Sequence, residues 1–170
     1  KSGKVKLHKI TIPEGYDIKQ IAALLETNKF TDSKRFIELA NNADYIKKLK
    51  LKANSIEGYL FPSTYYLTEG MTDEEIISMI IRNFNQVMRK NDIATLCKKN
   101  KLKLYDLLKI ASLVEKEAGI NTERPVIAAI FLNRLKLNMK LESCATVLYA
   151  IGDPEKRKTY LKDEDLKTDS

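Results

Sequence analysis

Residues 104–118 read LYDLLKIASLVEKEA, and this stretch decides the fold of the second half of the chain. Apolar residues recur in it at helical spacing and form one continuous arc of an amphipathic helix. They are Leu104, Leu107, Leu108, Ile110, Ala111, Leu113, Val114 and Ala118. Glu115 and Glu117 fall inside this arc, although burying a charge without a partner is costly. Each carboxyl group is therefore expected either to pair with a cation or to stay protonated with a raised pKa.

The helical pattern leaves two interpretations of these glutamates open. In the structural interpretation, Arg124 or Arg134 forms an ion pair with one or both carboxylates. In the functional interpretation, an apolar site keeps one carboxyl protonated, which a general acid needs near neutral pH. The spacing alone does not distinguish Glu115 from Glu117.

The first half of the chain predicts a small α/β lobe. Alternating apolar residues over positions 5–12 predict a strand, which ends at a proline and a glycine. Asp17 is placed to cap a first helix, and Thr31 or Asp32 a second one. The next segment, residues 54–70, is rich in aromatic residues and punctuated by glycine and proline, and it predicts an ordered loop or short extended segment.

The remainder predicts a mainly helical lobe. Thr72 and Glu75 form a capping box for a helix that runs to about Lys90. Another helix begins near residues 123–125, where a proline suits the first turn, and a short one is expected around residues 145–151. We therefore predict an α+β fold, with a first lobe over residues 1–53 and a second over residues 54–170.

Composition directs any chemistry toward carboxylates. The 170 residues include one histidine, His8, and two cysteines, Cys97 and Cys144, in no metal-binding spacing. A histidine-based triad or metal site is therefore not expected, and neither is a cofactor. The net charge of +7 comes from lysines spread along the chain, so a solvated basic surface is the simplest interpretation. No helix-turn-helix or RNA-binding motif supports nucleic acid as a partner.

Four stretches, in order along the chain, resemble motifs of the endolytic murein transglycosylases, the YceG-like family. They are IPEGY at 12–16, EGYLFP at 57–62, ASLVEKEAG at 111–119 with ERP at 123–125 and FLNRL at 131–135, and MKLES at 139–143. The matches cover nearly the whole chain. The resemblance implies a lytic transglycosylase, which cleaves the bond between MurNAc and GlcNAc in peptidoglycan and leaves 1,6-anhydroMurNAc ends.

The resemblance also implies roles for individual residues. The catalytic glutamate of lytic transglycosylases precedes a small residue, which matches Glu117 before Ala118 and makes Glu115 structural. Further motif residues are implied to line or support the substrate groove. They are Glu57, Tyr59, Tyr65, Arg124, Asn133, Arg134, Ser143, Thr146 and Tyr149. Each also has a structural interpretation, as a buried aromatic ring or as an arginine paired with Glu57, Glu115 or Glu123.

Beyond the site, the resemblance implies a LysM-like character for residues 1–53 and a second lobe that continues past residue 170. It implies an anchor of one N-terminal transmembrane helix outside this sequence, a location on the outer face of the cytoplasmic membrane, and peptidoglycan polymerases as companions. The chain departs from the family pattern at Cys144-Ala145, where the family has Asp-Pro, and at Glu142, where it has Gln. This departure and the LysM-like lobe motivate an alternative, a non-catalytic peptidoglycan-binding or scaffold module.

Overall fold

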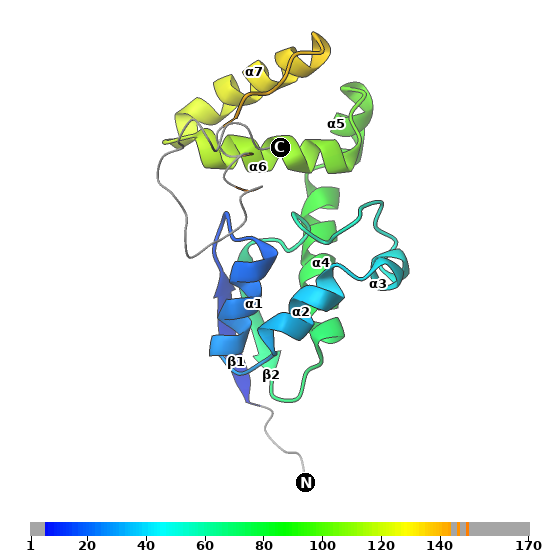
Figure 1. Ribbon diagram of the computed structural model, residues 1–170, viewed down its shortest axis with the longest axis vertical. Helices are drawn as coiled ribbons and strands as arrows, with labels where there is room; N and C mark the ends of the chain where they lie inside the picture. Colours follow the sequence, from blue (N-terminus) through cyan, green and yellow to red (C-terminus); the bar gives the residue numbers. More distant parts are fainter. Residues whose placement is uncertain (1–5, 144–145, 147–148, 150–170) are drawn as a thin grey trace, which may run out of the picture. The chain divides into compact units, whose positions relative to one another are not determined.

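The structure, a computed structural model, describes residues 6–143 together with Thr146 and Tyr149 (Figure 1). It is a mixed α+β structure, as predicted. It has a small antiparallel sheet, and the other regular elements are helices. The chain divides into two compact units, and the division falls between Tyr105 and Asp106. We call them the first and second units.

The sheet of the first unit joins segments that lie far apart in the sequence. Strand β1 (Leu7–Ile12) pairs antiparallel with β2 (Ser63–Thr68), with Leu7 opposite Thr68 and Ile12 opposite Ser63. Figure 1 shows the two strands side by side. Alternate residues of each strand point into the core, as the period of two in a strand requires. Residues 54–70, predicted as an ordered loop or short extended segment, contain the strand β2 that completes the sheet.

The first unit contains five described helices, and three of them begin at caps that the sequence indicates. The five helices are α1 (Ile18–Thr27), α2 (Ser33–Ala40), α3 (Ala43–Lys48), α4 (Asp73–Lys90) and α5 (Ile93–Lys99). Asp17 caps α1, Asp32 caps α2, and Thr72 and Glu75 form the predicted capping box of α4. The short helices α3 and α5 were not predicted.

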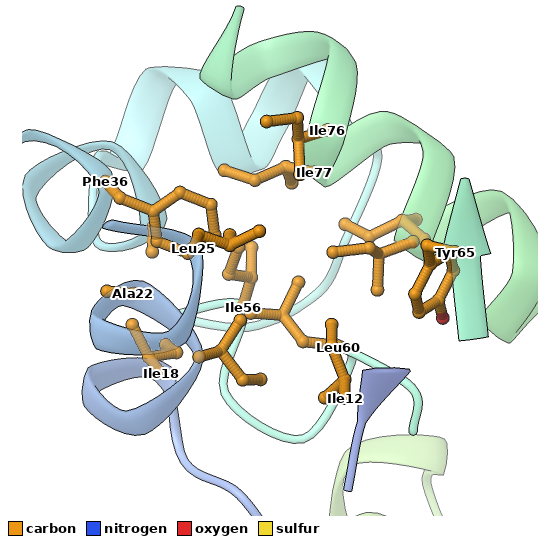
Figure 2. Packing of buried hydrophobic residues seen from close by; sticks show 14 of the residues in the cluster. Ile12, Ile18, Ala22, Leu25, Phe36, Ile56, Leu60, Tyr65, Ile76 and Ile77 are labelled. Atoms are coloured by element: carbon orange, nitrogen blue, oxygen red, sulfur yellow. The ribbon is translucent and has the colours of Figure 1, made fainter. Parts of the chain in front are cut away.

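One apolar core holds the first unit together (Figure 2). It draws buried residues from both strands, from α1 to α4, and from the connection before β2. Its largest fully buried side chains include Phe36, Leu25 and Ile77, and Ile56 is also buried although it lies in a loop. The predicted lobe boundary after residue 53 therefore does not coincide with a boundary between compact units.

A buried carboxylate joins α2 to the start of α4. Asp73 is 6% exposed and accepts hydrogen bonds from Thr31 Oγ1 at 2.5 Å and Arg35 Nε at 2.6 Å. The bond to Asp73 raises the pKa of the Arg35 guanidinium. This arrangement satisfies the charge of Asp73, because a buried ion needs both a partner and hydrogen bonds.

The second unit is built on α6 (Leu104–Glu117), which begins just before the division, a short 3-10 turn (Asn121–Glu123) and α7 (Arg124–Lys136). In the part of this unit that the structure describes, the core consists of Ile110, Leu113 and Val114 from α6 and Phe131 from α7. The helix predicted around residues 145–151 lies outside the described residues, apart from Thr146 and Tyr149. No helix in the described part of the chain combines the length and apolarity needed to cross a bilayer.

Candidate active site

Glu117 is the last residue of α6, and its side chain is exposed. The preceding apolar arc packs through Ile110, Leu113 and Val114, one to two turns before it. Glu115 is half-buried. The apolar arc therefore does not bury Glu117, because the helix ends at this residue and the packed part of the arc lies earlier in the helix.

Ser143 lies directly against Glu117. Its Oγ donates a hydrogen bond to Glu117 Oε1 at 2.5 Å, a short distance even for a hydroxyl donor and a carboxylate. Ser143 is 5% exposed, so a buried hydroxyl meets a carboxyl group whose residue is exposed. Thr146 Oγ1 in turn donates to the backbone oxygen of Ser143 at 2.7 Å. The structure thus brings together three of the predicted site residues, Glu117, Ser143 and Thr146.

Arg134 binds the turn that leads into Ser143. Its Nη1 donates to the backbone oxygens of Lys140 at 2.9 Å and Leu141 at 3.0 Å. The same nitrogen also donates to Glu142 Oε2 at 2.8 Å. The structural interpretation predicted an arginine paired with Glu57, Glu115 or Glu123, whereas the ion pair that Arg134 forms is with Glu142.

Glu123 orders the connection between α6 and α7. Its Oε2 accepts hydrogen bonds from the N–H groups of Gly119 at 3.1 Å and Ile120 at 3.4 Å.

Arg124 and Asn133 are exposed residues of α7, and Tyr149 is 63% exposed. The structure therefore places these three predicted groove residues in the second unit with Glu117.

The predicted groove residues Glu57, Tyr59 and Tyr65 belong to the first unit and occupy structural positions. Glu57 Oε2 accepts a hydrogen bond from the N–H of Ile18, the first residue of α1, at 3.2 Å. The ring of Tyr59 is 2% exposed and packs on Phe84, with the ring centroids 5.2 Å apart.

Tyr65 is equally integrated into the core of the first unit. Its hydroxyl donates to the backbone oxygen of Phe61 at 2.6 Å and accepts from Asn83 Nδ2 at 3.0 Å. Burial raises the pKa of both Tyr59 and Tyr65. Both tyrosines are buried, so their placement supports the interpretation that they pack the interior of the first unit.

Sequence reasoning missed the turn of residues 140–142 as part of the site. Glu142 was noticed only as a departure from the family pattern, yet it is the ion-pair partner of Arg134. Its positive φ of 51°, which non-glycine residues adopt infrequently, gave no signal in the sequence. Among the residues that the structure describes, no cluster of three or more histidine, cysteine, aspartate or glutamate side chains is arranged to hold a metal ion.

Chemically, the arrangement centres on one carboxyl group. A hydroxyl donor fixes Glu117 Oε1, and a buried serine position orients that donor. A carboxyl group oriented in this way can release a proton and later accept one, which are the two tasks of a general acid and a general base.

Comparison with known proteins gives consistent results. The model of the YceG-like family matches residues 1–170. The chain is 35% identical over 178 aligned positions to an endolytic murein transglycosylase of Bacillus subtilis, an alignment that covers 95% of this chain and 48% of the relative. It is 32% identical to an endolytic murein transglycosylase of Streptococcus pneumoniae, over 84% of this chain and 29% of the relative.

A solved structure agrees with these relatives. The crystal structure of a YceG-like protein from Listeria monocytogenes superimposes with a TM-score of 0.83 at 29% sequence identity. The match covers 98% of this chain and 58% of the Listeria chain. The chain therefore spans about half the length, or less, of the curated relatives that it matches.

Proposed function

The chain belongs to the YceG-like family, and from this membership we propose that it forms part of an endolytic murein transglycosylase that cleaves peptidoglycan glycan strands. The observation that carries the proposal is the hydrogen bond from Ser143 to Glu117. It joins the two motif segments that the family resemblance singled out, and it orients a single carboxyl group. One such group is sufficient for this reaction, whereas glycoside hydrolases usually need two.

The first step of the proposed reaction uses Glu117 as an acid. Because Oε1 accepts the bond from Ser143, the transferable proton belongs on Oε2. Glu117 gives this proton to the oxygen that links C1 of MurNAc to GlcNAc, and the bond between C1 and that oxygen breaks. The resulting carboxylate keeps the hydrogen bond from Ser143, which stabilises its new negative charge.

The second step uses Glu117 as a base. The carboxylate takes the proton of the C6 hydroxyl of the same MurNAc, whose oxygen forms the new bond to C1 and closes the 1,6-anhydro ring. The proton given away in the first step is thereby recovered, and no water is consumed. No metal or cofactor takes part in either step of the proposed reaction.

The test compares two isosteric variants of the full-length protein. Glu117→Gln removes the transferable proton and is expected to lower the release of 1,6-anhydroMurNAc ends by about 10²–10⁴-fold, the usual contribution of general acid–base catalysis. Glu115→Gln, two residues earlier on the same helix, is the matched control and is expected to retain activity. The proposal is abandoned if Glu117→Gln releases these ends at the wild-type rate.

The setting of this activity is part of the same proposal. Peptidoglycan glycan strands are the proposed substrate, and peptidoglycan polymerases are the proposed companions. We propose attachment to the cell membrane by a single N-terminal helix outside this sequence, with the catalytic part on the extracytoplasmic side. Support comes from the family resemblance, and fractionation of cells that produce the tagged full-length protein tests the location.

A LysM-like role for residues 1–53 also remains a proposal. Its support is that β1, α1 and α2 share one apolar core and are therefore held in a fixed arrangement. A glycan-binding role predicts that the full-length Glu117→Gln variant still sediments with insoluble peptidoglycan. Binding without turnover by the wild-type protein would instead favour the alternative of a scaffold module.

A further inference from the structure

We propose that Arg134 is a positioning residue for Glu117, acting through the turn of residues 140–142 and through Ser143. This inference rests on the proposed function, because it explains how the acid and base of that reaction is held. Arg134 itself touches neither Glu117 nor Ser143 in the contacts that the structure shows. Its effect passes along the backbone, from the turn it binds to the residue that follows the turn.

Arg134 holds the segment after α7 at both ends. Its backbone oxygen accepts hydrogen bonds from the N–H groups of Leu137 at 3.1 Å and Met139 at 2.9 Å. Its side chain reaches forward to the backbone oxygens of Lys140 and Leu141 and to the carboxylate of Glu142. One residue therefore closes the whole loop between the end of α7 and Ser143.

The backbone of this loop needs contacts that hold it in place. We call the hydrogen bonds from the Arg134 side chain to residues 140–142 the clamp. Asn138 and Glu142 both have positive φ, 53° and 51°, so a residue near each end of the loop adopts the left-handed conformation. L-residues enter this region at a conformational cost, and they stay there only where surrounding contacts fix them. Arg134 Nη1, whose two hydrogens are shared among its three acceptors, supplies these contacts immediately before Ser143.

The position of Ser143 Oγ depends directly on the turn. Ser143 follows Glu142 in the chain and is 5% exposed, so its side chain cannot reorient toward solvent without a change in the backbone. Its hydroxyl donates the hydrogen bond to Glu117 Oε1, so the position of the donor follows the backbone of Ser143. A small shift of the turn is therefore expected to misplace the donor that orients the reactive carboxyl group.

Glu142 gives this clamp a charge that the family pattern lacks, because the resemblance places Gln at this position. The side chain of Arg134 is 29% exposed and that of Glu142 is 68% exposed, so the pair lies at the surface. Exposed ion pairs contribute little by themselves. The hydrogen bond that Glu142 accepts, rather than its charge, is therefore expected to help fix Arg134 against the turn, and Gln is expected to replace Glu142 well because it keeps an acceptor oxygen.

The experiment measures turnover of soluble glycan strands by the full-length protein. Arg134→Met removes the donors but keeps a long side chain, and kcat is expected to fall about tenfold to a hundredfold with KM little changed. Ser143→Ala is expected to have a similar effect. Because both variants act on one path, the double variant should lose no more than the larger single loss. Lys136→Met, on an exposed residue in the same last turn of α7, is the matched control and should turn over normally.

Several outcomes overturn the inference. Arg134→Met with wild-type kcat would do so, and so would losses that multiply in the double variant. A purely structural role would instead lower the folded fraction seen in thermal unfolding, reduce turnover in proportion, and multiply with the loss in Ser143→Ala.

Glu142 provides the second test if Arg134→Met fails to fold. Glu142→Ala is expected to lower kcat severalfold, while Glu142→Gln stays within about twofold of wild type, since only the alanine variant loses the acceptor. Equal rates for Glu142→Ala and wild type would then reject the clamp. An active Glu117→Gln variant would reject the proposed function itself, whereas an inactive Glu117→Gln beside a fully active Arg134→Met rejects only the positioning role.

Discussion

The two compact units of this chain are held together in different ways. The first unit has an extensive apolar core that gathers both strands and helices α1 to α4 around residues such as Phe36 and Ile77. Among its described residues, the second unit has a core of four buried side chains from two helices. Its remaining order comes from polar contacts, above all those of Arg134 and Ser143. The proposed reactive carboxyl group lies in this second unit.

This difference assigns stability and chemistry to separate regions. Apolar burial makes local opening costly, so the first unit is expected to open only near the global free energy of unfolding. The described residues of the second unit bury less apolar surface and should open at a lower free energy. Variants of its polar contacts are therefore expected to change activity more than global stability.

The largest expected effect on stability comes from truncating the two cores. Phe36→Ala removes a fully buried ring from the first unit and is expected to cost about 3–5 kcal/mol of unfolding free energy. Phe131→Ala, at a ring that is 6% exposed in the second unit, should destabilise that unit alone. Hydrogen exchange followed by mass spectrometry distinguishes the two variants. Phe36→Ala should lower the protection of amide groups in the first unit, whereas Phe131→Ala should lower it in the second unit and leave the first unchanged. Equal loss of protection in both units for either variant would show that the units unfold as one.

Local signals in the sequence predicted much of the first unit. Capping residues indicate where three of its helices begin, because each cap accepts a hydrogen bond from a backbone N–H group within the next turn. They are Asp17, Asp32 and Thr72. Helices α3 and α5 were not predicted, since they are short and α5 has no buried residue to mark a face. The pairing of β1 with β2 also went unpredicted, because it joins segments separated by more than fifty residues.

The candidate site was less predictable from physical patterns. Helical spacing placed Glu117 on an apolar arc of α6. Spacing gives the angle of a residue around the helix axis, but it does not show how far along α6 the packing against α7 extends. Ser143 was expected near the groove from the family resemblance alone. The contacts formed by Arg134 depend on the backbone conformation of Asn138 and Glu142, and glutamate gives no signal for the positive φ that Glu142 adopts.

An intermediate effect is expected at the start of α4. Thr72 Oγ1 accepts a hydrogen bond from the N–H of Glu75 at 3.3 Å, and Glu75 Oε2 accepts from the N–H of Thr72 at 2.8 Å. Thr72→Ala removes one half of this capping box and should cost about 1 kcal/mol. Chemical denaturation measures the loss, and activity per folded molecule should not change because Thr72 belongs to the first unit. An unchanged midpoint would indicate that α4 is fixed by its packing alone.

The smallest expected effect compares the ends of one helix from each unit. Lys29 follows α1 with a φ of 62°, and Asn138 follows α7 with a φ of 53°. Both ends have the same bonding pattern, in which the next residue donates to a backbone oxygen five positions earlier, as Phe30 does to Leu25 and Met139 to Arg134.

Glycine adopts this conformation without steric cost, and its greater loss of chain entropy offsets part of the gain. Lys29→Gly should therefore stabilise the first unit by about 0.5–1 kcal/mol. Asn138→Gly should change stability less, because asparagine already tolerates positive φ. The two variants are compared by thermal unfolding and by turnover. A glycine at position 138 also loosens the loop that Arg134 closes, so a loss of activity there without a loss of stability would support the view that this loop serves positioning rather than folding.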